Sequence, residues 1–228
     1  MRGDRDSPRP LVYVAIGASE TVGIGTIDPL RDAWPSVLWR RLPPGTSFYN
    51  LGLPGTTTRE AIIEQLPLAK VADPDIVTVW LNVNDILRNV RPAQYGRDLQ
   101  RLLAGLSERG SFIILVANAP KLDRLPLYRA CRSPDARFTP PFGPAVKCPQ
   151  EMLGELPGPE IARDLVNAYN AQVRQAARAE DARVVDLHEL VGSAVERRAY
   201  VSSDGFHPST AGAIAIANAF WRAYKLSV

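Results

Sequence analysis

Apolar runs rich in β-branched residues, alternating with stretches of helical periodicity, constrain the fold of this chain more than any other feature. Four strong runs and a weaker one occur, namely LVYVAI, IVTVWL, FIILVA and ARVVDL at 11–16, 76–81, 112–117 and 182–187, and TSFYNL at 46–51. Helical patterns lie between and after them, at about 28–41, 57–70, 92–109, 160–180 and 209–225. Continuous apolar runs are typical of strands buried on both faces. The alternation predicts an α/β fold in which helices cover both faces of a parallel sheet.

The composition is that of one globular domain. The 228 residues are 46% hydrophobic and 22% charged, so the chain can bury a substantial core, and we expect a single domain spanning 1–228. The net charge of +3 comes from 27 basic and 24 acidic residues without a long run of like charges. This dispersed pattern argues against a nucleic-acid partner.

The chain has no apolar run near the ~20 residues that a membrane-spanning helix requires. Its start, MRGDRDSPRP, lacks the apolar region of a signal peptide. As it stands, the chain is expected in the cytoplasm, and secretion stays open if a signal was removed. Nothing in the sequence indicates an oligomeric state.

The segment at about 118–159 interrupts the strand and helix alternation. It follows the fourth run, contains nine of the twenty prolines, and has apolar side chains such as Leu125 and Phe142. Long loops in compact domains are usually functional, so we expect a lid-like insertion near the site. It contains Cys131 and Cys148, the two cysteines of the chain. A disulfide between them would add roughly 3 kcal/mol, but two thiols in a reducing compartment fit the sequence as well.

Ligands of open α/β sheets collect in the loops that follow the strands. The first such loop, GASETVGIG at 17–25, contains Ser19 and three glycines. Glycines let a loop turn tightly, so it either aims the serine hydroxyl outward or cradles a phosphate. The glycine spacings of dinucleotide-binding motifs and P-loops are both absent, which argues against a nucleotide. An ordinary turn that contains a serine would explain this loop on its own.

Two further strand ends carry groups suited to hydrogen bonding. NLGLPGTTT at 50–58 contains Gly52, where the backbone can approach a ligand closely, although glycine with proline also marks ordinary turns. WLNVNDIL at 80–87 contains Asn84 and Asp85 at the end of an apolar strand. Either residue could instead cap the following helix.

The stretch DGFHPS at 204–209 contains one of two histidines, and it places Asp204 three residues before His207. Histidine has a pKa of ~6.5 and is a natural general base at neutral pH. In a turn, the carboxylate can orient the imidazole, which gives the base half of a hydrolytic triad. A turn that leads into a capped helix would explain why an aspartate stands at 204, but it would not explain why a histidine stands at 207. The other histidine, His188, is expected to be structural or on the surface.

The order and spacing of these four motifs resemble those of the SGNH hydrolases, also called the GDSL esterase/lipase family. The resemblance runs from Gly17 to His207 and rests most on D-x-x-H at 204–207 and x-N-D at 83–85. It implies a flavodoxin-like, three-layer α/β/α sandwich with a five-stranded parallel sheet. It implies no metal and no organic cofactor.

The same resemblance assigns roles to five residues. Ser19 would be the nucleophile, His207 the base and Asp204 its orienter. The backbone amides of Ser19 and Gly52 and the side chain of Asn84 would form the oxyanion hole. An α/β-hydrolase is not indicated, because the G-x-S-x-G motif of that fold is missing around Ser19.

Two departures from the family pattern lie next to these residues. The G-D-S-L block reads Gly17-Ala18-Ser19-Glu20, so its aspartate and leucine are both replaced and the loop must be supported differently. The G-x-N-D block reads Asn82-Val83-Asn84-Asp85. We expect Asn82 either to narrow the site or to add a hydrogen-bond donor.

The sequence therefore favours a cofactor-independent serine esterase or lipase that cleaves carboxylic esters through an acyl-enzyme on Ser19. Short-chain esters, lipids, thioesters and acetylated sugars all remain open as substrates. The alternative is a catalytically silent module of the same fold that binds a carbohydrate or acyl ligand in the same cleft.

Overall fold

The protein is built around one five-stranded parallel sheet. The computed structural model describes residues 9–107, 113–132, 137–138, 146–147, 156–190 and 198–227. The strand order is β2-β1-β3-β4-β7, and every neighbouring pair is parallel. The strands are β1 (Val12–Gly17), β2 (Ser47–Asn50), β3 (Ile76–Trp80), β4 (Ile113–Ala117) and β7 (Arg183–Val185). The α/β fold and the parallel sheet predicted from the sequence are confirmed.

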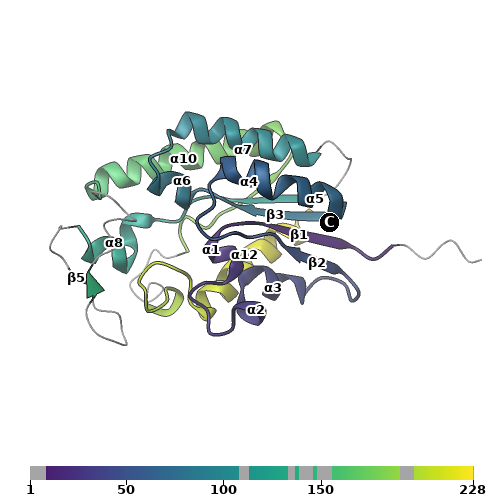
Figure 1. Ribbon diagram of the computed structural model, residues 1–228, viewed down its shortest axis with the longest axis horizontal. Helices are drawn as coiled ribbons and strands as arrows, with labels where there is room; N and C mark the ends of the chain where they lie inside the picture. The colour runs from purple at the N-terminus through teal and green to yellow at the C-terminus, as the bar shows by residue number, and fades with distance from the viewer. Residues whose placement is uncertain are drawn as a thin grey trace, which may run out of the picture.

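Helices cover both faces of the sheet, as Figure 1 shows. One layer consists of α4 (Thr58–Glu64), α5 (Leu66–Ala72), α7 (Pro92–Ser107) and α10 (Pro159–Ala179). The other consists of α2 (Pro29–Asp32), α3 (Trp34–Trp39) and α12 (Thr210–Lys225). In β1, Val14 and Ile16 pack in the first layer's core, whereas Tyr13 and Ala15 pack in the second's. This alternation of buried side chains explains why the strand sequences are continuously apolar.

Two helices expected to be continuous are each broken in two. The pattern at 28–41 forms α2 and α3, which are separated by extended backbone at Ala33, and the pattern at 57–70 forms α4 and α5, separated at Gln65. Pro35 and Pro67 stand in the first turn of the second helix in each pair. Proline has no amide hydrogen to donate to the preceding turn, so it is tolerated where a new helix begins.

The segment at 118–159 is described in part. It includes the 3-10 turn η1 (Leu122–Arg124), α8 (Pro126–Ala130) and the antiparallel pair β5 (Arg137–Phe138) and β6 (Val146–Lys147). Leu125, Leu127 and Tyr128 are buried. Cys131 is disulfide-bonded, and Cys148, Phe142 and Met152 lie outside the described residues. Throughout the described ranges, every helix is too short or too polar to cross a lipid bilayer.

Candidate active site

Ser19 lies at the first position of the short helix α1 (Ser19–Val22), directly after β1. Gly17, two residues before Ser19, is fixed by Gln65 of the α4–α5 junction. The Gln65 side chain accepts from the Gly17 amide and donates to the Gly17 carbonyl, both at 3.0 Å. Gln65 is fully buried. This pair of bonds supports the loop that carries Ser19, in which Ala18 offers no polar side chain.

His207 and Asp204 lie on a tight turn between Val201 and Pro208, which form an isolated antiparallel bridge. The Ser202 amide donates to the His207 carbonyl at 2.8 Å, and Gly205 adopts a positive φ of 72° that closes the turn. The helix α12 follows and is capped by Ser209, whose hydroxyl accepts from the Gly212 amide. DGFHPS is therefore a turn that leads into a capped helix, and the same turn brings an aspartate and a histidine together.

The turn brings His207 against Ser19, although 188 residues separate them in the sequence. His207 Nε2 lies 3.0 Å from Ser19 Oγ, and His207 Nδ1 lies 2.6 Å from Asp204 Oδ2. With the ring proton on Nδ1, Nε2 accepts a hydrogen bond from the serine hydroxyl. Ser19, His207 and Asp204 thus form a connected chain of hydrogen bonds.

Asp204 is held in its ionised form. Partial burial opposes ionisation, but hydrogen bonds from the His207 ring, the Ser202 hydroxyl and the Phe206 amide outweigh it and lower the pKa of Asp204 to about 2. The Asp204 Oδ1 atom accepts from Ser202 Oγ, Phe206 N and His207 N at 2.7, 2.8 and 2.9 Å. Asp204 is therefore an anion at neutral pH, which favours the Nδ1–H tautomer of the histidine.

Gly25 sets how closely the Ser19 loop approaches this turn. It has a positive φ of 95°, and a Cβ built on it would lie 2.5 Å from the Pro208 carbonyl oxygen and 2.8 Å from His207 Cβ. A side chain at this position would be both strained and in collision with the backbone next to the histidine. The glycine thus permits the close packing of two loops that carry Ser19 and His207.

Gly52 follows β2, beside α1. Its amide donates to Asn50 Oδ1 at 3.1 Å, and the Asn50 side chain in turn donates to the Thr21 carbonyl at 2.8 Å. The Ser19 amide lies in the first turn of α1, where an amide has no acceptor within its own helix. Gly52 thus lies at the expected strand end, and its N–H donates a hydrogen bond to the side chain of Asn50.

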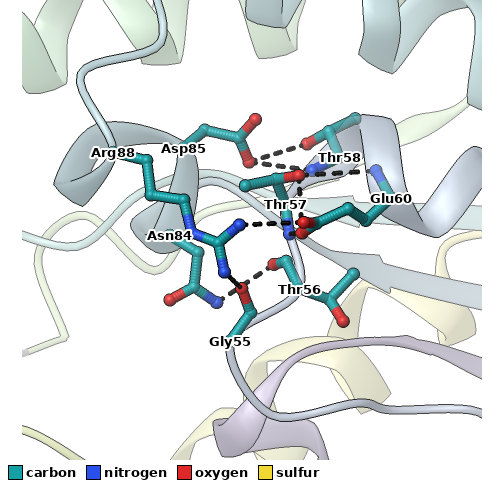
Figure 2. A network of polar contacts seen from close by, with 8 residues as sticks. All are labelled: Gly55, Thr56, Thr57, Thr58, Glu60, Asn84, Asp85 and Arg88. Atoms are coloured by element: carbon teal, nitrogen blue, oxygen red, sulfur yellow. Dashed lines mark hydrogen bonds and ion pairs between the residues drawn. The ribbon is translucent and has the colours of Figure 1, made fainter.

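Asn84 lies on α6 (Val83–Leu87), which follows β3. Its Nδ2 donates to the Thr56 carbonyl at 3.0 Å, which leaves the second hydrogen of the amide for another acceptor. Arg88 joins the same loop, since it donates to the Gly55 carbonyl and to Glu60, both at 2.8 Å. Figure 2 shows Arg88 and Asn84 contacting adjacent residues of this loop. The loop and α6 therefore hold one another in place.

The polar side chains that flank Asn84 have structural partners. Asp85 is almost completely buried and accepts from the amide and hydroxyl of Thr58, the first residue of α4, each at 3.0 Å (Figure 2). Burial is the largest influence on the pKa of Asp85 and raises it to about 6, although the bonds from Thr58 oppose the shift. Asn82 is also buried, and its Nδ2 donates to the Ala117 carbonyl at 3.2 Å, which ties the ends of β3 and β4 together.

The second histidine, His188, lies apart from this chain of hydrogen bonds. Its Nδ1 lies 3.1 Å from both the Asn170 amide nitrogen and the Ala119 carbonyl oxygen. Asn170 also pairs with the backbone of Ala119. These contacts fix the loop after β4, in keeping with a structural histidine.

Comparison with known proteins identifies the family. The model of the GDSL-like lipase/acylhydrolase family matches residues 15–214. The chain belongs to this family. By sequence, no curated protein matches the chain.

Solved GDSL-type structures share the fold at low sequence identity. A lipase/acylhydrolase from Enterococcus faecalis matches with a TM-score of 0.65 and 18% identity, over 95% of this chain and 96% of that chain. A family 3 carbohydrate esterase from Clostridium thermocellum matches with a TM-score of 0.64 and 18% identity, over 96% and 97%. LAE5, an enzyme from the Lake Arreo metagenome, matches with a TM-score of 0.67 and 20% identity, over 94% and 95%.

Two apolar pockets adjoin the GDSL site and share one wall, which is formed by Leu122, Leu125 and Phe206. One pocket reaches His207 and the ends of β3 and β7, and the other runs between α6, α8 and α10. The Leu127 amide of α8 donates to the Gly205 carbonyl at 3.0 Å, which joins the proline-rich segment to the histidine turn. No group of three or more His, Cys, Asp or Glu side chains in the described ranges could hold a metal ion.

The sequence did not predict the supporting residues Gln65, Glu60 and Arg88. All three lie in regions of helical pattern or at their edges, where polar residues usually face solvent. For Gln65, the break before Pro67 was a usable signal, because a polar side chain at a helix junction is free to reach a neighbouring loop. For Arg88 and Glu60, no local pattern marks the partner 28 residues away.

Proposed function

We propose that the protein is a serine-dependent carboxylic ester hydrolase, with Ser19 as nucleophile, His207 as general base and Asp204 as the residue that orients it. The observation that carries this proposal is the continuous chain from Ser19 Oγ to His207 Nε2, at 3.0 Å, and from His207 Nδ1 to Asp204 Oδ2, at 2.6 Å. Membership of the GDSL-like lipase/acylhydrolase family supports the same reaction class.

The reaction would proceed in two steps. Ser19 Oγ forms a bond to the ester carbonyl carbon while His207 takes the hydroxyl proton, and the alcohol then leaves with that proton. Water next attacks the acyl-enzyme, again giving its proton to His207, and the carboxylic acid is released as the proton returns to Ser19. Asp204 remains ionised throughout and stabilises the charged imidazole.

The developing oxyanion would be stabilised from the ends of three adjacent strands. The Ser19 amide and the second hydrogen of the Asn84 side-chain amide are available donors. The Gly52 amide would join them only after exchanging its bond with Asn50 for one to the oxyanion. Each such donor typically contributes about 10²-fold or more to the rate.

Replacement of the nucleophile tests this proposal. Ser19→Ala should lower kcat for p-nitrophenyl acetate by at least about 10⁴-fold, and a fluorophosphonate should label Ser19 in the wild-type protein. Ser107→Ala, on α7, is the matched control. Retained hydrolysis in Ser19→Ala would exclude the proposed nucleophile. An unreactive Ser19 in the folded wild-type protein would favour the silent ligand-binding module.

A further inference from the structure

Four large aliphatic side chains beside the candidate site face solvent, and the mechanism above gives them no role. Ile27 and Leu30 are 89% and 91% exposed, and Ile24 and Ile214 are also exposed. We call these four residues the apolar rim. A single exposed aliphatic side chain is ordinary, but several gathered at one place mark a contact surface.

The loop after α1 carries Ile24 and Ile27 along the edge of the candidate site. The Ile24 amide donates to the Ser19 carbonyl at 3.0 Å. The Ile27 amide donates at 3.0 Å to the hydroxyl of Thr210, the residue at which α12 begins. Between them, Gly25 packs closely against the turn that carries the histidine. This half of the apolar rim therefore borders both loops of the site.

The other half of the apolar rim joins the same place through Thr210. Ile214 follows Thr210 by four residues, so the two lie on the same side of α12. Leu30 lies on α2, and Asp32 of that helix accepts from the Thr210 hydroxyl at 3.3 Å. Both helices belong to the same layer, as Figure 1 shows. The four side chains thus form one surface next to the catalytic residues.

The charged groups next to Leu30 are mainly basic in effect. Arg31 and Arg40 are exposed, and Arg40 donates to the Arg31 carbonyl at 2.8 Å, so the two arginines are neighbours. The acidic side chains of this segment already have partners. Asp28 accepts from the Arg31 amide at 3.3 Å, and the largely buried Asp32 accepts from the Arg31 side chain at 3.2 Å.

The helix α12 continues this pattern. Arg222 and Lys225 are exposed on α12, and Lys225 stands three turns after Ile214 on the same side of the helix. The sequence from 205 to 228 contains no aspartate or glutamate. The surface that includes the apolar rim is therefore apolar at the site and basic around it.

We propose that the apolar rim and the arginines beside it form a docking surface for a phospholipid bilayer with anionic headgroups. Ile27 and Leu30 would enter the bilayer interface, where surface attachment grows with buried apolar area and with attraction to anionic lipids. Arg31 and Arg40 would contact lipid phosphates, which match the planar guanidinium group. The apolar rim contains no aromatic residue, although aromatic residues are enriched in protein interfaces, and this favours a lipid over a protein partner.

Vesicle binding tests this inference. The wild-type protein should cosediment with vesicles of phosphatidylglycerol mixed with phosphatidylcholine, and less so at high salt. The double variant Ile27→Ser/Leu30→Ser should bind these vesicles at least about tenfold more weakly, because it loses the two most exposed side chains. Arg40→Gln should weaken binding about threefold. Val71→Ser is the matched control, since Val71 is 83% exposed on α5, at the opposite edge of the sheet, and should not affect binding.

The controls keep this inference separate from the proposed function. Ser19→Ala should bind the vesicles as the wild-type protein does, because docking requires no nucleophile. Circular dichroism confirms that each variant folds. Absence of wild-type binding at low salt, equal binding to pure phosphatidylcholine, or undiminished binding by the double variant would overturn the proposal. A wild-type dimer that binds no vesicles and that Ile27→Ser/Leu30→Ser dissociates would also overturn it, and would identify a second copy of the chain as the occupant.

Discussion

Asp204, on the turn before α12, and Asp85, on α6, are two aspartates near the candidate site, yet their pKa values move in opposite directions. The pKa of Asp204 is lowered to about 2, and that of Asp85 is raised to about 6. Both accept hydrogen bonds from a backbone amide and a hydroxyl. Asp204 adds the imidazole and a second amide, and 42% of its side chain is exposed, whereas Asp85 is 1% exposed.

The difference shows that the balance between donors and burial decides the charge of a carboxyl group. Four donors and partial access to water keep Asp204 ionised, as the proposed base requires. The two donors from Thr58 do not offset the burial of Asp85, which fastens the start of α4 to α6 beside Asn84. Substitutions of the two aspartates should therefore affect different properties. Activity should be most sensitive to a change at Asp204, and stability to a change at Asp85.

The largest expected effect is on activity and follows from removing the charge of Asp204. Asp204→Asn should lower kcat for p-nitrophenyl acetate by about 10³- to 10⁴-fold, because the histidine loses its orienting anion and its preferred tautomer. Asp164→Asn, on the exposed side of α10, is the control. If Asp204→Asn kept near-wild-type kcat, the carboxylate would have only a structural role in the turn.

The next effect is on stability. The folded-state pKa of Asp85 lies above the ordinary aspartate value of about 3.9, so the folded protein binds more protons between about pH 4 and pH 6. The contribution of Asp85 to the free energy of unfolding is thus full below about pH 4 and falls as pH rises through 6, by on the order of 3 kcal/mol. Asp85→Asn should remove this fall, as measured by urea unfolding at pH 4 and pH 7. The same pH dependence in wild type and Asp85→Asn would contradict the raised pKa.

A smaller effect is expected at Arg88, which supports the Asn84 side of the site. Arg88→Ala removes the bonds to Gly55 and Glu60, so the loop that holds Asn84 should loosen. We expect kcat to fall about tenfold with little change in KM, because an oxyanion donor acts mainly in the transition state. Arg59→Ala, on the exposed face of α4, should leave both constants unchanged. An effect confined to KM would indicate that Arg88 acts on substrate binding instead.

The smallest expected effect is at Ser202, one of four donors to Asp204. Ser202→Ala should raise the pKa of Asp204, yet the remaining three bonds should keep it ionised at neutral pH. We expect kcat/KM at pH 7 to fall two- to fivefold. A loss comparable with that of Asp204→Asn would show that the donors to Asp204 act as one unit.

The sequence predicted the fold because each buried strand is a continuous apolar run and each long helix has its own periodicity. It also placed Ser19, Gly52, Asn84, Asp204 and His207 at strand ends or in the last turn, where position follows from topology. Asn84 was predicted as either a donor or a cap, and in the structure its side chain donates to the Thr56 carbonyl, while α6 has no side-chain cap. The roles assigned to these residues stay predictions until the variants are measured.

The contacts that support the site could not be predicted, because they join segments that no local pattern relates. Gln65 reaches Gly17 across 48 positions, and Arg88 reaches Gly55 across 33. Glu20 was recognised as a departure from the family pattern, but the pocket that it lines together with Trp80 and Leu122 joins segments far apart in the sequence. Such side chains become informative only when the folded backbone has fixed their neighbours.

The close packing at Gly25 has a consequence for how this protein can vary. Gly25 contributes no functional group, yet any side chain there would displace the loop that carries His207. A mutational scan scored by activity alone should therefore rank Gly25 with Ser19 and His207 as intolerant to every substitution. Labelling by an irreversible serine reagent would not distinguish variants of these three residues. The distance between the two loops would distinguish them. At this position, the site requires the space that a side chain would fill.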